Sequence, residues 1–93
     1  MGGGEKMKRL YSTFLNSKTL KNKFISTENN AFANCIKKVY RKKVRVYRDG
    51  QVLVYFYGID KKPTYKKLMP ESVNILKKYL SGKKIDNYKI CWQ

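Results

Sequence analysis

Histidine is absent from this 93-residue chain, and only six residues are acidic. Without histidine, the commonest general base of enzymes is missing, together with the commonest protein ligand for metals. The acidic residues are scattered, and no two have the spacing of a glycosidase or a metal site; they are Glu5, Glu28, Asp49, Asp60, Glu71 and Asp86. These shortages argue against conventional hydrolase chemistry. We expect no catalytic residue, no metal site and no cofactor.

Cysteine and long apolar runs are also scarce. Two cysteines, Cys35 and Cys91, are too few for a disulfide-dense secreted scaffold. Cys35 lies in an apolar helical pattern, so we expect it to pack as a small hydrophobe. The sequence has no apolar run long enough for a membrane span or a signal-peptide core. We therefore expect a cytoplasmic protein with reduced thiols, or a nuclear one if its source is a eukaryotic virus.

What the chain has in excess is positive charge. It contains 22 lysines and arginines, which gives a formal net charge of +16. Such a field attracts polyanions, so nucleic acid is the first partner to expect, with DNA ahead of RNA. An acidic protein is the alternative partner, and the oligomeric state stays open. The abundance of Lys, Asn, Tyr and Ile is typical of an AT-rich source such as a virus or mobile element.

The length and the apolar content of 42% indicate one small globular domain. We place this domain at residues 7–93. The preceding segment Met1–Lys6, MGGGEK, reads as a flexible leader or a cloning scar.

The clearest structural signal is the stretch 42–57, KKVRVYRDGQVLVYFY. Two β-branched and aromatic runs flank Asp49-Gly50, which predicts a hairpin with a two-residue turn. In that register Val46 lies opposite Leu53. The predicted core face then carries Val44, Val46, Leu53, Tyr55 and Tyr57, and the other face carries Lys43, Arg45, Tyr47, Val52, Val54 and Phe56. A shift of one residue would exchange these roles.

Two helices are predicted around the hairpin. The segment Ser26–Asn29 suits a helix start, and the apolar stripe after it predicts a helix over 28–42; the stripe is Ala31, Phe32, Cys35, Ile36, Val39 and Tyr40. Pro70-Glu71-Ser72 opens a second helix over 70–81, with Gly82 as its C-terminal cap. Its apolar stripe is Val73, Leu76 and Leu80, with Ile75 and Tyr79 beside it.

The remaining segments carry weaker patterns. Residues 64–69 alternate enough for a short third strand. Loosely helical spacing predicts a helix over 7–15, with a strand over 8–14 as the alternative, and a second short turn near 17–24. The segment 88–92 is either a final strand or a packed extension. The fold class expected is α+β, with a small antiparallel sheet (hairpin 43–57 and a short third strand) packed against two or three helices.

The hairpin YRDGQVLVYFYGIDKK, with the helix before it, resembles the central strands of small bacterial endoribonuclease toxins of the RelE type. That resemblance implies a ribonuclease that needs no histidine, because Arg and Lys stabilise the charge on the reacting phosphate. The residues to test would be Arg45, Arg48, Lys66 and Tyr65. The helix after Met69 departs from that family, in which the sheet usually continues.

The order strand, Asp-Gly turn, strand, short strand and helix over 43–81 is similar to the three-stranded DNA-binding domains found ahead of mobile-element integrases. That resemblance implies a sheet face in the major groove with the helix packed behind it. No recombinase core accompanies it here. With helix 28–42 in front, the same order resembles a double-stranded RNA-binding domain, although Pro70-Glu71-Ser72 stands where that family has a lysine cluster.

We therefore predict a non-enzymatic nucleic-acid-binding domain of viral or mobile-element type. The alternatives are the endoribonuclease toxin and a protein-binding inhibitor or assembly factor. The predicted phosphate contacts are Lys37, Lys38, Arg41, Lys42 and Lys43 at the end of the first helix, and Lys61, Lys62, Lys66 and Lys67 beyond the hairpin. The predicted base or sugar contacts are Arg45, Tyr47 and Arg48.

Overall fold

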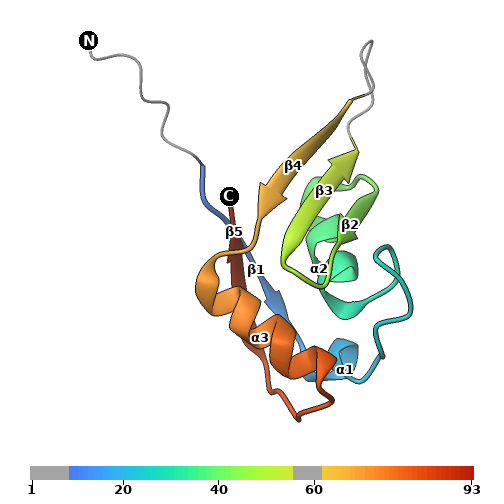
Figure 1. Ribbon diagram of the computed structural model, residues 1–93, viewed down its shortest axis with the longest axis vertical. Coiled ribbons are helices and arrows are strands. Elements are labelled where there is room, and N and C mark those ends of the chain that lie inside the picture. The colour runs from blue at the N-terminus through green and yellow to red at the C-terminus, as the bar shows by residue number, and fades with distance from the viewer. Residues whose placement is uncertain (1–8, 56–61) are drawn as a thin grey trace, which may run out of the picture.

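The computed structural model describes residues 9–55 and 62–93 (Figure 1). Within these ranges the chain forms β1 (Tyr11–Leu15), α1 (Ser17–Leu20), α2 (Ala31–Tyr40), β2 (Val44–Val46), β3 (Gln51–Tyr55), β4 (Pro63–Lys67), α3 (Pro70–Leu80) and β5 (Tyr88–Trp92). The expected α+β class is confirmed. The predictions for the leader 1–6 and for Phe56, Tyr57 and Lys61 lie outside the described residues.

The described strands form two antiparallel sheets, β2-β3-β4 and β1-β5. The sheets meet where β4 ends. Lys67 and Gln93 exchange two backbone hydrogen bonds of 2.8 and 3.0 Å, and the Met69 N–H donates to the Cys91 carbonyl at 2.9 Å. The strands therefore follow one another in space as β1-β5-β4-β3-β2. This arrangement leaves the final segment 88–92 as a strand rather than a packed extension.

The first element is a strand, so the predicted helix over 7–15 is wrong and its alternative is confirmed. Burial alternates along β1: Leu15 is buried and Tyr11 and Thr13 are half-buried, whereas Ser12 and Phe14 are exposed. Antiparallel pairing with β5 determines this period of two. The apolar residues of this segment alone did not distinguish helical spacing from the alternation of a strand.

The hairpin turn contains three residues rather than the predicted two. The Tyr47 N–H donates to the Gln51 carbonyl at 2.8 Å, and the Gly50 N–H donates to the Tyr47 carbonyl at 2.9 Å. The Asp49 carboxylate accepts a further bond from the Gln51 N–H at 3.1 Å. Gly50 takes a φ of +93°, which absorbs the extra residue as a bulge.

The longer turn shifts the strand register by one residue. Val44 lies opposite Val54, Arg45 opposite Leu53, and Val46 opposite Val52. The faces predicted for β2 hold, but those predicted for β3 are wrong, because a shift of one residue moves every side chain of a strand to the other face. Val52 and Val54 therefore join the core, while Leu53 and Tyr55 share the outer face with Arg45.

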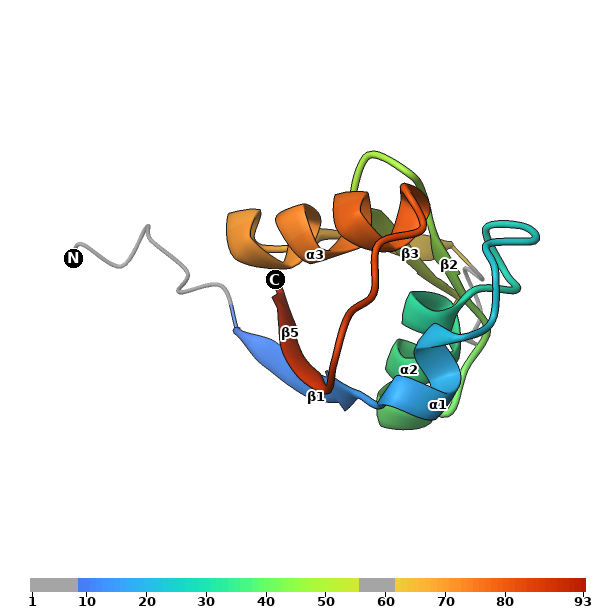
Figure 2. The ribbon, with the colours of Figure 1, turned by 90° about the horizontal axis from the view of Figure 1, so that it is seen from below.

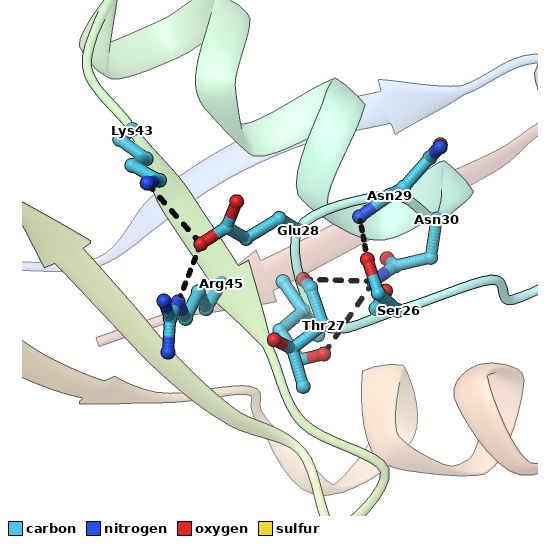
Figure 3. Close-up of polar contacts among 8 residues, drawn as sticks. Ser26, Thr27, Glu28, Asn29, Asn30, Lys43 and Arg45 are labelled. Atoms are coloured by element: carbon cyan, nitrogen blue, oxygen red, sulfur yellow. Dashed lines mark hydrogen bonds and ion pairs between the residues drawn. The ribbon is translucent and has the colours of Figure 1, made fainter.

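Helix α2 begins three residues later than predicted, because Asn30 rather than Ser26 or Thr27 caps it. The Asn30 side-chain oxygen accepts from the Ala33 N–H at 2.8 Å. Its amide nitrogen donates to the carbonyls of Ser26 and Thr27 at 2.9 and 3.0 Å (Figure 3). The segment 26–30 is thereby a loop fixed beside the sheet instead of a first helical turn.

Helix α3 starts at Pro70 as predicted, and Gly82 follows it with a φ of +78°. Its buried stripe is rotated from the prediction: Ser72, Ile75, Leu76 and Tyr79 are buried, whereas Val73 and Leu80 are half-buried. The Tyr79 hydroxyl accepts from the Ala31 N–H at 3.3 Å and donates to the Asn22 carbonyl at 2.5 Å. This side chain therefore ties α3 to the start of α2.

Both longer helices and both sheets surround one core, as the view from below shows (Figure 2). The core includes Cys35, as expected, and Trp92, which is fully buried. The inward faces of the strands supply Val44, Val46, Val52, Val54, Leu15 and Ile90. The helices and the segment after β4 supply Ala31, Phe32, Ala33, Ile36, Leu68, Ile75, Leu76 and Tyr79. Within the described residues no helix is long and apolar enough to cross a membrane.

Candidate nucleic-acid interface

The β2-β3-β4 sheet turns one face away from this core, and we call it the outer sheet face. Its central row consists of Arg45, Leu53 and Tyr65, one residue from each strand. The rows on either side follow from the same register. The outer sheet face comprises Lys43, Arg45, Tyr47, Gln51, Leu53, Tyr55, Pro63, Tyr65 and Lys67.

The outer sheet face carries both tyrosines and cations. Tyr65 is 69% exposed, and Tyr47 and Tyr55 are half-buried. The Lys43 Nζ lies 5.8 Å and the Arg45 Cζ 5.5 Å from the centre of the Tyr55 ring, within the range of cation–π attraction. The face therefore combines positive charge with flat aromatic surface.

The carboxylate of Glu28 contacts two cations of this face (Figure 3). Its Oε1 lies 2.8 Å from the Arg45 Nε and 3.3 Å from the Lys43 Nζ. Partial desolvation acts to raise the pKa of Glu28, but the hydrogen bonds from Arg45 and Lys43 outweigh it and hold that pKa below its ordinary value. The hydrogen bond with Tyr47 is the largest cause that raises the pKa of Arg45, and the hydrogen bond with Glu28 is the next largest. Arg45 is thus held in place on the sheet.

The position of Glu28 comes from the loop before α2. The Val46 N–H donates to the Thr27 carbonyl at 2.9 Å, which pairs this loop with the edge of β2. Asn30 fixes the other end of the loop through the bonds described above. A carboxylate that the sequence assigned to a helix start is therefore placed over Arg45 of β2 and over Lys43, which directly precedes that strand.

The helix-end cations gather in a shallow hollow at the end of α2. Its volume is about 370 Å³, and its charged lining residues are Glu28, Lys37, Arg41, Lys42 and Lys43. Lys43 also belongs to the outer sheet face, so the hollow and the face form one continuous cationic surface. Lys38 is exposed on the same last turn of the helix.

Two other predicted contact residues, Lys66 and Arg48, lie away from this surface. Lys66 points to the opposite side of β4, where its Nζ lies 4.8 Å from the centre of the Tyr11 ring. The Arg48 Cζ lies 4.5 Å above the Phe24 ring, at the hairpin turn. Lys62 is exposed just before β4.

The same placement separates the residues of the ribonuclease interpretation. Arg45 and Tyr65 share the central row of the outer sheet face. Lys66 follows Tyr65 directly in a strand, so its side chain is on the other face. Arg48 contacts Phe24 instead. The four residues do not form one site.

Sequence reasoning missed the contributions of Tyr55 and Gln51 to this face. Tyr55 was assigned to the core because of the two-residue turn, and a bulge at Gly50 is the signal that would have corrected it. Gln51, Tyr65 and Lys67 border a second hollow, of about 580 Å³, beside β4. This hollow puts an amide, an aromatic ring and a cation next to one another.

Three groups with raised pKa values lie in or against the core. Burial raises the pKa of the Cys35 thiol and of the Tyr40 and Tyr79 hydroxyls, all of which pack into or against the core. Among residues 9–55 and 62–93 no cluster of three metal-ligating side chains is present.

Comparison with protein-family models, curated proteins and solved structures found no match to this chain.

Proposed function

We propose that this chain is a non-enzymatic nucleic-acid-binding domain that contacts its ligand through the outer sheet face and the hollow at the end of α2. The observation that carries the proposal is the continuity of the two regions through Lys43. The two regions bring cations from a helix end together with cations and tyrosines of a sheet, and the net charge of +16 favours a polyanion.

The two regions would have different roles. Lys37 and Arg41 are exposed at the end of a helix, where long cationic side chains reach phosphates without reading sequence. The outer sheet face carries side chains suited to sugars and bases, because its rings and the Gln51 amide offer stacking and hydrogen bonding. DNA is the first ligand to test, because β2, β3, β4 and α3 follow the order seen in the integrase-associated DNA-binding domains.

The experiment is a titration of fluorescently labelled 20-nucleotide DNA and RNA, single-stranded and duplex, by anisotropy at several salt concentrations. The logarithm of the affinity should fall linearly with log salt, by about 0.9 per phosphate neutralised on duplex DNA. Substituting both Lys37 and Arg41 with Gln should make that slope shallower by about one unit for each phosphate that the variant no longer neutralises. The labelled RNA should remain intact on a denaturing gel.

The matched control is the double substitution Lys83→Gln and Lys84→Gln. It removes the same charge from exposed residues that line a different hollow, with Leu20 and Ile85. If both double variants weaken binding equally, net charge rather than this surface determines affinity. If poly-glutamate binds as tightly as the oligonucleotides with the same salt dependence, the partner is an acidic protein and the proposal fails.

A further inference from the structure

We infer that the outer sheet face binds single-stranded nucleic acid, with an unpaired base stacked on Tyr65. This inference rests on the proposed function and specifies its ligand. Tyr65 is the most exposed aromatic residue of the face, at 69%. The hollow of about 580 Å³ beside it leaves space next to the ring, with Gln51 and Lys67 at its border.

The physical reason is the availability of aromatic surface. Bases inside a duplex already stack on their neighbours, so only an unpaired base can lay its face on a tyrosine ring. The Gln51 amide can donate and accept hydrogen bonds at a base edge, and Lys67 can contact the adjacent phosphate. Gln51 and Lys67 lie opposite each other in neighbouring strands, one row from Tyr65.

The arginines of the hairpin are poorly placed to read a duplex. Reading guanine in the major groove requires a guanidinium whose paired donors reach the base edge. Arg45 instead donates to Glu28 at 2.8 Å and lies over Tyr55. Arg48 lies over Phe24. In the central row Leu53 is buried and Arg45 is half-buried, so Tyr65 is the exposed group, and its ring is more suited to stacking than to groove readout.

The test compares four labelled 20-mers of one sequence at fixed salt: single-stranded DNA, single-stranded RNA and the two matching duplexes. The single strands should bind at least about fivefold more tightly than the duplexes, because each stacked base contributes about 5- to 150-fold in affinity. Tyr65→Ala should lose that factor on single strands and change duplex affinity less than about twofold. Tyr65→Phe keeps the ring and should bind within about twofold of the native chain.

Phe14→Ala is the matched control, because Phe14 is also 69% exposed and lies on a strand of the other sheet. It should leave single-strand affinity unchanged. A second readout is photo-crosslinking to strands that contain 5-bromouracil, followed by mass spectrometry, which should identify the peptide with Tyr65. This readout uses the native chain and is independent of any folding defect in a variant.

The possible outcomes separate the two proposals. Equal affinity for single strands and duplexes, with no effect of Tyr65→Ala, would overturn the single-strand inference and leave the proposed function in place. Crosslinks confined to other peptides would overturn it as well. No measurable binding to any of the four oligonucleotides would refute both. The relative affinities of the DNA and RNA single strands identify which of them is the ligand.

Discussion

Gly50→Ala should test the hairpin turn directly. Gly50 has a φ of +93°, and a Cβ built there would lie 2.8 Å from the Cγ2 of Val73 in α3. The glycine carbonyl also accepts a hydrogen bond from the Leu68 N–H at 2.9 Å. The turn is therefore held between its own strands, the end of β4 and the first turns of α3, so an added methyl group has little space.

The expected cost combines two terms. An L-residue at a positive φ costs about 1–2 kcal/mol, and forcing an extra methyl into a packed contact costs about 1–3 kcal/mol. Gly50→Ala should therefore lower the free energy of unfolding by about 2–5 kcal/mol. Gly82→Ala is the matched control, since Gly82 has a φ of +78° with no atom within 4 Å of the added Cβ. It should lose only about 1–2 kcal/mol.

The assay is urea denaturation followed by far-UV circular dichroism. Val73→Ala removes the clashing methyl group, so the double variant of Gly50→Ala with Val73→Ala should recover the packing part of the loss in a double-mutant cycle. Our assignment of the turn would be refuted if Gly50→Ala cost no more than Gly82→Ala. It would also be refuted if the cycle showed no coupling between residues 50 and 73.

Three further substitutions concern the charged surface and the core. Glu28→Gln should strengthen oligonucleotide binding and steepen its salt dependence, because it releases the two cations that Glu28 pairs with, and titrations with the variant check this. Because ion pairing lowers the pKa of Glu28, its contribution to stability should be complete above about pH 4.5 and disappear as the pH falls further, which thermal melts across pH would detect. Arg41→Gly should stabilise the protein by about 1 kcal/mol, because Arg41 has a φ of 55°, yet make the salt dependence of binding shallower; a destabilised variant would contradict this. Tyr79→Phe should cost about 1–3 kcal/mol in urea denaturation, because it removes the hydroxyl that joins Ala31 and Asn22, and an unchanged midpoint would contradict that role.

The sequence predicted the ends of a helix well where a single proline or glycine determines them. Pro70 fixed the start of α3 and Gly82 followed its end, because each residue's backbone preference suits its position without help from neighbours. The start of α2 was predicted less well. Ser26, Thr27 and Asn30 can all cap a helix, and the loop pairing between Thr27 and Val46 selected Asn30.

In the candidate site, too, the sequence predicted what depends on one strand and missed what depends on contacts between distant segments. Lys43, Arg45 and Tyr47 were correctly predicted to share a face, because alternation along one strand holds whatever its partner is. Lys67 was likewise expected on the same face as Tyr65. The position of Glu28 over Lys43 and Arg45 had no signal in the sequence, because it depends on where a loop meets the edge of β2.

The sequence by itself thus determined which segments form the hairpin and α3, and the positive charge that they carry. Only the tertiary structure decided that β1 pairs with β5, that Tyr55 faces outward, and which cations lie together. The physical reason is that strand pairing and register depend on contacts between distant segments, such as Gly50 against Val73 and Leu68. The ends of α3 and the alternation within one strand depend on residues a few positions apart, so they could be predicted without knowing which segments meet.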